Sequence, residues 1–166
     1  MIPHTERITF RKFKMSDVPL VHQLNSDPRV MHHIQEVRDL EESTADLERY
    51  LNYYDQYPGY GYWPAFFRSS QQFMGWFVVK KLPETEECEL GYRLLPEFWG
   101  QNLATEGSKA CIDYAFEGLA ATHMVAVAVP ENKASCRVLE KCGFEFQKID
   151  TFYQTQCAYY RLDGPL

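Results

Sequence analysis

The stretch that most constrains this chain is LLPEFWGQNLATEGSKACIDYAF, from Leu94 to Phe116. It begins apolar and extended, breaks at Pro96, and passes through a Gly-Gln-Asn turn into a helix that we expect from about Thr105 to Gly118. A helix N-terminus presents unpaired backbone amides and the positive end of the helix dipole. The turn carries few charged side chains, so the sequence predicts an anion-binding site made by the backbone.

The individual turn residues suit this role. Gly100 allows close approach of the backbone to a ligand, and Asn102 is one of the few other residues that tolerate a left-handed conformation. Ala104 keeps the first helical turn thin, and Thr105 and Glu106 can cap it. A Gly-Asn turn before a helix is more often only a turn, so this motif alone does not establish a ligand site.

The remaining pattern indicates a single α/β domain over residues 1–166. Alternating or apolar runs predict strands within residues 7–13, 63–70, 72–82, 86–95, 122–130, 144–149 and 157–162. Capping residues and helical spacing predict helices within residues 16–25, 44–57, 105–118 and 132–143, with a further helical turn within 27–34. The order β-α-α-β-β-β-α-β-α-β-β is typical of a mixed sheet with helices on its faces.

Composition excludes several classes of partner. The formal net charge is -6 and no run of Lys or Arg occurs, which argues against nucleic acid. No segment approaches the roughly 20 apolar residues of a membrane span, and no signal peptide is evident. His32 and His33 lack companion ligands at metal-binding spacing. The 5 cysteines form no C-x-x-C pair, so we expect reduced thiols and a cytoplasmic protein.

A second motif, PENKASCRVLEKCGFE, follows an apolar strand at Pro130 to Glu145. Together with ELGYRLLPEFWGQNLATEG it resembles the GNAT superfamily of acetyl-CoA-dependent N-acyltransferases, in the RimJ/RimL-like branch of ribosomal-protein N-terminal acetyltransferases. That branch typically shows ELGYxLxPxxWGxGxATEA followed by NxxSxxVxEKxGF. The resemblance implies the GNAT fold, with a mixed, mostly antiparallel central sheet and helices on both faces. Two residues depart from it: Asn102 replaces a glycine, and Gly107 replaces the usual alanine.

The resemblance also implies a cofactor site and a reaction. Acetyl-CoA would be the co-substrate, and an amine would attack its thioester directly in a ternary complex. The backbone of Leu94 and Leu95 would pair with the pantetheine arm, and Asn132 would hydrogen-bond to it. The amides that would hold the pyrophosphate belong to Trp99, Gly100, Gln101, Asn102, Leu103, Ala104 and Thr105.

Two residues are candidates for catalysis. Many members of the family have a tyrosine acid at the position of Leu139, which cannot donate a proton. Ser135 lies four residues earlier on the same helical side, and it either stabilises the departing thiolate or only packs against the cofactor. Glu89 is the candidate base, although a solvated or salt-bridged strand carboxylate is the more common role for such a residue, and a chain of waters could serve as the base instead.

The acceptor is less constrained. The segment RYLNYYDQYPGYGYW is rich in aromatic rings, and Tyr60 and Trp63 are its most exposed candidates for lining an acceptor pocket. The favoured acceptor is a protein or peptide N-terminus, followed by a small amine. The alternative function is a catalytically silent acyl-CoA-binding sensor or scaffold, and a third is an α/β domain without cofactor. A homodimer is compatible with the family.

Overall fold

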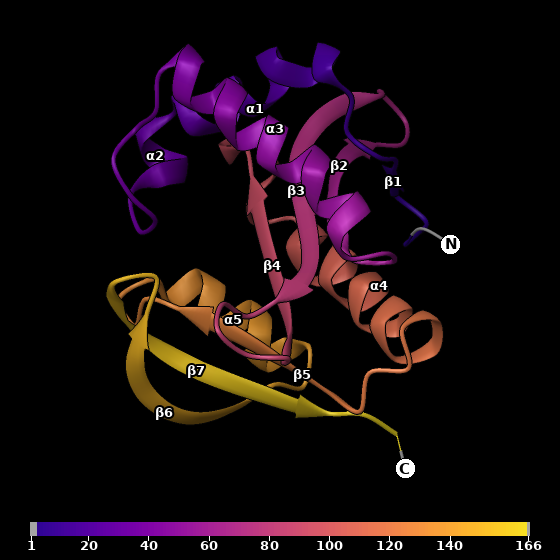
Figure 1. Ribbon diagram of the computed structural model, residues 1–166, viewed down its shortest axis with the longest axis vertical. Coiled ribbons are helices and arrows are strands. Elements are labelled where there is room, and N and C mark those ends of the chain that lie inside the picture. The colour runs from indigo at the N-terminus through magenta and orange to yellow at the C-terminus, as the bar shows by residue number, and fades with distance from the viewer. Residues whose placement is uncertain (1–2, 166) are drawn as a thin grey trace.

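The strands of residues 3–165, which the computed structural model describes, form one sheet in the order β1-β2-β3-β4-β5-β7-β6 (Figure 1). The predicted domain also includes residues 1, 2 and 166, which lie outside this range. The strands are β1 (Ile8–Phe10), β2 (Gly61–Phe67), β3 (Gln72–Lys81), β4 (Cys88–Leu94), β5 (His123–Ala128), β6 (Glu145–Phe152) and β7 (Thr155–Asp163). Only β4 and β5 pair in parallel, which confirms the mixed, mostly antiparallel sheet.

Helices cover both faces of this sheet. The α-helices are α1 (Val18–Asn25), α2 (Pro28–Met31), α3 (Leu40–Gln56), α4 (Leu103–Gly118) and α5 (Lys133–Lys141), with 3-10 turns η1 (Met15–Asp17) and η2 (Pro96–Phe98). Apolar residues of α1, α2 and α3 pack with Trp76 and Val78 of β3. Those of α4 and α5 pack with Phe77 and Val79 on the opposite face. The two cores therefore follow the alternation of β3.

The helical region before β2 differs from the prediction at its start. Three helices occupy it, and α3 begins at Leu40 rather than near Thr44. The cause is a capping box: the Asp39 carboxylate accepts from the Glu42 amide at 2.8 Å, and the Glu42 carboxylate accepts from the Asp39 amide at 2.9 Å. This box satisfies amides at the helix start, so the helix includes an additional turn. No helix in the described residues is long and apolar enough to cross a membrane.

The junction of β4 and β5 opens the sheet. Their pairing is limited to Cys88 with Met124 and Glu89 with Val125, whereas β4 pairs with β3 along its whole length. The Leu95 amide donates to the Met74 carbonyl at 2.8 Å. Because the hydrogen-bonding direction alternates along a strand, the backbone groups of Tyr92 and Leu94 face the side where β5 has diverged. The sheet therefore offers unpaired strand backbone at this point.

Candidate active site

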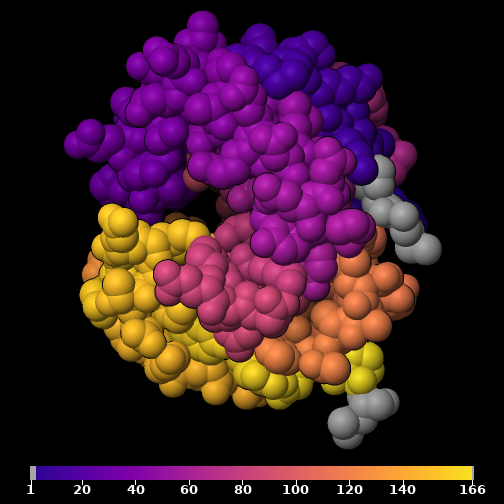
Figure 2. Space-filling view, in the orientation of Figure 1, coloured from indigo at the N-terminus to yellow at the C-terminus, as the bar shows by residue number. Residues whose placement is uncertain are grey.

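A cleft of about 1930 Å³ occupies the space between the diverging strands and continues toward the N-terminal helices. Its loop end is lined by residues of the β4–α4 connection and α5, including Gly100, Asn102, Thr105 and Ser135. Its tyrosine end is lined by Tyr50, Tyr53, Tyr57, Tyr62 and Trp76. Figure 2 shows a hollow where the N-terminal helices, the β3–β4 turn and the β6–β7 hairpin meet. The cleft is large enough to hold two reactants side by side.

The loop end has the conformation that the sequence predicts. Gly100 has φ 70° and Asn102 has φ 59°, and nothing lies within 4 Å of a Cβ built on Gly100. Among the described residues, no hydrogen-bond acceptor is assigned to the amides of residues 100–105. The Trp99 amide, in contrast, donates to Pro96 at 3.1 Å, so it does not belong to the free row. The side-chain amide of Gln101 donates to the Glu97 carbonyl at 2.7 Å, so only the backbone amide of Gln101 is available for a ligand.

Two cations lie beside this loop, and they were not expected from the sequence. The Lys141 ammonium lies 3.3 Å from the Asn102 amide oxygen, and both residues line the cleft together with Arg137. Lys141 is part of the second motif, but its proximity to the loop depends on how α5 packs beside α4. The candidate anion site therefore combines backbone amides with side-chain charge.

Asn132 and Leu94 lie along the cleft, between the loop and the strands. The Asn132 oxygen caps α5 by accepting from the Ser135 amide at 3.2 Å, which leaves its amide nitrogen as a donor. The Leu94 carbonyl accepts from the Trp99 indole nitrogen at 2.9 Å, which leaves the Leu94 amide facing the cleft. The prediction for Leu95 is wrong, because its amide is bonded to Met74 and its side chain is only 3% exposed.

Two side-chain hydroxyls, those of Tyr92 and Ser135, line the cleft near each other. Burial raises the pKa of Tyr92, and the nearby Ser135 side chain opposes this rise. Both residues line the cleft, whereas Leu139 is buried in the core. Tyr92 belongs to the first motif and was not singled out from the sequence. The alternation of side chains along β4 places Tyr92 on the same side of the cleft as Ser135. A tyrosine hydroxyl is therefore available there, although position 139 is a leucine.

Glu89 lies on the opposite face of β4 in a cluster of three polar groups. Its carboxylate pairs with the Lys80 ammonium at 2.6 Å and accepts from the Tyr153 hydroxyl, with the Glu89 side chain 6% exposed. Lys80 also contacts the Tyr153 hydroxyl. Burial and the charge of Glu89 raise the pKa of Tyr153 above its ordinary value, so its hydroxyl is a donor here. Sequence analysis missed Lys80 and Tyr153, because Tyr153 reaches Glu89 from the distant β6–β7 turn.

The tyrosine end differs from the prediction. Trp63 is only 3% exposed and its ring packs edge-on against Tyr114, so the expectation that it is exposed is wrong. Tyr60 is partly buried against the same core. The reason is strand alternation: Tyr62 points to the cleft, and its neighbour Trp63 points to the α4 side. Tyr62 and Tyr50 stack at 3.9 Å between ring centroids and form part of the wall.

The described residues contain no group of three metal-ligating side chains. The site instead offers acid–base groups beside an anion-binding loop. Tyr92 and Ser135 lie on one wall, and Glu89, Lys80 and Tyr153 lie on the other. Such an arrangement can stabilise developing charge and move protons between two bound molecules.

Comparison with known proteins agrees with this geometry. The family model described as "Acetyltransferase (GNAT) domain" matches residues 7–145. The Aspergillus fumigatus FsC-acetyl coenzyme A-N(2)-transacetylase is 32% identical over 162 residues, covering 87% of this chain and 67% of that protein. An acetyltransferase structure from Agrobacterium tumefaciens has a TM-score of 0.86 at 25% identity, covering 99% and 96% of the two chains. The structure of RimL, a ribosomal L7/L12 alpha-N-protein acetyltransferase in complex with coenzyme A, has a TM-score of 0.81 at 18% identity, covering 98% and 97%.

Proposed function

This chain belongs to the GNAT family of acetyltransferases, and we propose that it transfers the acetyl group of acetyl-CoA to a primary amine at the N-terminus of a protein or peptide. The family uses acetyl-CoA as its acetyl donor, so the donor is given and the acceptor is the open part of the proposal. The observation that carries the proposal is the row of unpaired amides at residues 100–105 beside the opening between β4 and β5. It matches the needs of a long, polyanionic co-substrate.

The chain's own groups are suited to hold that co-substrate. The free amides of Gly100–Thr105 and the Lys141 ammonium would bind its pyrophosphate. The strand backbone of Tyr92 and Leu94 and the Asn132 side-chain nitrogen would pair with the amides of the pantetheine arm. The thioester would then lie where β4 and β5 diverge, between the two groups of acid–base residues.

The reaction needs a base, a group that stabilises the carbonyl oxygen and a donor to the thiolate, and the site has a candidate for each. Glu89, held by Lys80 and Tyr153, would accept the proton that the amine loses. An unpaired amide of β4 would stabilise the carbonyl oxygen as the nitrogen–carbon bond forms. The carbon–sulfur bond then breaks, and the Tyr92 hydroxyl or the neighbouring Ser135 would donate a proton or a hydrogen bond to the thiolate.

The choice of a protein N-terminus rests on two arguments. An α-amino group has a pKa of about 7.7–8.0, against about 10.4 for a lysine side chain, so the modest base at Glu89 suffices. RimL has the same fold and acts on a ribosomal protein, and its branch shares the two motifs of this chain. A cytoplasmic location, supported by free thiols at Cys88, Cys111, Cys136, Cys142 and Cys157, and a homodimer remain part of the proposal.

A small amine is the second candidate acceptor. The observation in its favour is the tyrosine end of the cleft, which is walled by Tyr50, Tyr62 and Trp76. Such a walled pocket suits a compact molecule better than an extended chain.

Release of CoA thiol in the presence of acetyl-CoA and a panel of amines tests the proposal. We expect turnover with short peptides that have a free N-terminus and none with the same peptides after N-terminal blocking. Coenzyme A binding without turnover on any amine would instead favour a sensor or scaffold. The absence of any thermal shift with coenzyme A would contradict the assigned cofactor site.

A further inference from the structure

Arg93 is a cation on the cleft wall without a carboxylate partner in the described structure. It lies on β4, on the same strand face as Glu89 and four residues further along, which corresponds to about 13 Å between their Cα atoms. Three cations at the same end of the cleft are paired with carboxylates: Lys80 with Glu89 at 2.6 Å, Arg49 with Asp46 at 3.0 Å, and Lys81 with Glu86. Arg93 differs from these three because no carboxylate of the described residues pairs with it.

The contacts of Arg93 are neutral. Its Nη1 donates to the Asn25 side-chain oxygen at 2.7 Å, and its guanidinium lies 5.0 Å from the centroid of the Trp76 ring. Its Nε is buried and has no hydrogen-bond partner in the described residues. Burial lowers the pKa of Arg93, which reports the cost of keeping its charge at this place. An incompletely paired buried cation is expensive, and such groups are concentrated at functional sites.

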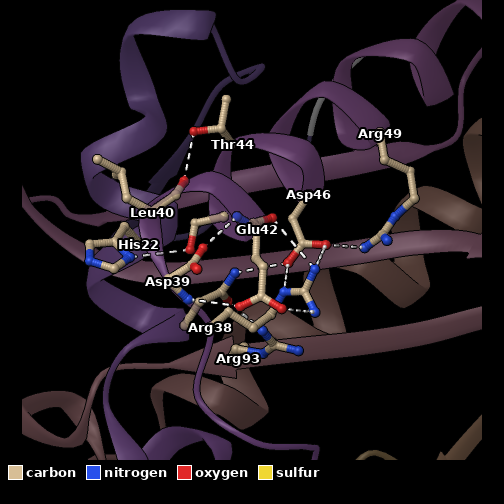
Figure 3. A network of polar contacts seen from close by, with 11 residues as sticks. His22, Arg38, Asp39, Leu40, Glu42, Thr44, Asp46, Arg49 and Arg93 are labelled. Atoms are coloured by element: carbon tan, nitrogen blue, oxygen red, sulfur yellow. Dashed lines mark hydrogen bonds and ion pairs between the residues drawn. The ribbon is translucent and has the colours of Figure 1, made fainter.

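The surrounding network does not neutralise this charge. Asp46 is its only buried carboxylate, and it already pairs with Arg38 at 2.8 Å and Arg49 at 3.0 Å (Figure 3). It also accepts from the Asn25 side-chain nitrogen at 2.9 Å, and Asn25 in turn contacts Arg93. Two further carboxylates belong to the network: Glu42 is 3.9 Å from Arg38, and Asp39 accepts from the Glu42 amide at 2.8 Å. Asp46 is thus shared by Arg38, Arg49 and Asn25, and no carboxylate of this network forms an ion pair with Arg93 in the described structure.

We propose that Arg93 binds a carboxylate carried by the acceptor, so that the substrate is an amine with an anionic group in reach of the reacting nitrogen. After Nη1 has bonded Asn25, Nη2 is the guanidinium donor left for a ligand, because Nε is buried, and a carboxylate accepts strongly from such a charged donor. The stacking on Trp76 holds the guanidinium plane in place. This inference rests on the proposed acetyl transfer and adds a negative group to its amine acceptor. The net charge of -6 alone would suggest an acceptor that is only cationic.

Matched pairs of acceptors test the subsite directly. One set is the ω-amino acids, from glycine through β-alanine to longer chains, each compared with its carboxamide. The other is short peptides with Asp or Glu at the second position, each compared with Asn or Gln. In the wild-type enzyme we expect kcat/KM for the best carboxylate to exceed that for its amide by about 10- to 100-fold, mainly through KM. Equal values across every turned-over pair would overturn the inference.

Substitution assigns the preference to Arg93. In Arg93→Gln the ratio of kcat/KM between each carboxylate and its amide should fall to about 1, because the charged contact is lost. The bond to Asn25 and the contact with Trp76 are lost as well, but their loss affects both members of a pair equally. Arg93→Lys should retain part of the preference, since it keeps the charge but not the fork. Arg161→Gln is the matched control, because this substitution removes the same charge. Arg161 pairs with Asp163 on β7 and lies outside the cleft lining. A preference that survives Arg93→Gln contradicts the assignment.

The design separates failure of the subsite from failure of the reaction. Coenzyme A binding without turnover of any acceptor would contradict the proposed function. Turnover of amides and carboxylates alike would contradict only the Arg93 subsite. If Arg93→Gln does not fold, as judged by its thermal melt, the salt dependence of KM in the wild-type enzyme tests the subsite instead. Added salt should raise KM for the carboxylates more than for the amides, and equal rises would overturn the inference.

Discussion

Gly107 lies so close to the ring of Phe77 that a Cβ at position 107 would come within 2.2 Å of Phe77 Cζ. Gly107 is on α4 and Phe77 is a fully buried residue of β3. The glycine therefore permits the helix to approach the sheet, and its replacement of the usual alanine is not merely a weakness of the helix. The loop that begins α4 depends on this docking, because it lies one turn earlier.

Gly107→Ala should destabilise the protein. The alanine gains about 1 kcal/mol of helix propensity, but crowding Phe77 in a closed core costs about 1–3 kcal/mol. We expect the melting temperature to fall by about 2–4 °C. Gly118→Ala is the control on the same helix, since its Cβ would meet Tyr114 at 3.4 Å, an ordinary contact, and we expect no loss there. A melting temperature at or above the wild type for Gly107→Ala would show that the ring moves aside freely.

Asn102 and Lys141 should contribute differently to coenzyme A binding. Asn102→Gly keeps a residue that accepts φ near 59°, so affinity measured by calorimetry should stay within about 3-fold or improve. Lys141→Gln removes a cation beside the loop and should weaken binding by about 3- to 10-fold at low salt, less at high salt. A large loss in Asn102→Gly would identify its side chain as a ligand of the cofactor.

Ser135→Ala and Tyr92→Phe should lower turnover more than cofactor affinity. Both hydroxyls line the same part of the cleft, and either can assist the thiolate, so we expect each change to reduce kcat by about 10- to 100-fold. The double variant should lose less than the product of the two, because the groups act as one unit. Steady-state kinetics and calorimetry measure both quantities. A loss of affinity with unchanged kcat would remove that residue from the chemistry.

Glu89→Gln should impair acceptors according to their basicity. Without the carboxylate, an amine with a pKa of about 10.4 loses its route to deprotonation, while an α-amine near 8 is partly neutral already. We expect a larger fall in kcat for a lysine-type amine than for a peptide N-terminus, and partial recovery of both as pH rises. Tyr153→Phe, which preserves the Lys80–Glu89 pair, serves as the milder comparison. Equal losses that do not respond to pH would leave Glu89 with a structural role only.

The loop and its helix were readable from the sequence because their chemistry is local. The left-handed backbone of Asn102 was predicted from the turn itself, and Gly100 shares it. The helix that follows begins at Leu103, two residues before the expected start near Thr105, and the cap that Asn132 gives α5 was not predicted. The capping box at Asp39 is equally local and was overlooked, which explains the misplaced start of α3.

The tyrosine end was less predictable because its chemistry is assembled from distant segments. Tyr153 contacts Glu89 across 64 positions, and Arg93 contacts Asn25 across 68. Trp63 was misassigned because an aromatic cluster in sequence does not reveal which face of β2 each ring takes. The grouping of Arg38 and Arg49 on Asp46, with Arg93 linked through Asn25, is visible only once α1, α3 and β4 are brought together.

The short parallel seam between β4 and β5 gives this molecule two halves held together by only two residue pairs within the sheet. A ligand that hydrogen-bonds both edges would act as a temporary strand and complete the interrupted ladder. Acetyl-CoA would then connect β4 to β5 as well as supply the acetyl group, and each catalytic cycle would make and break this connection. Amide hydrogen exchange in β5 should slow on saturation with coenzyme A and quicken again when it departs.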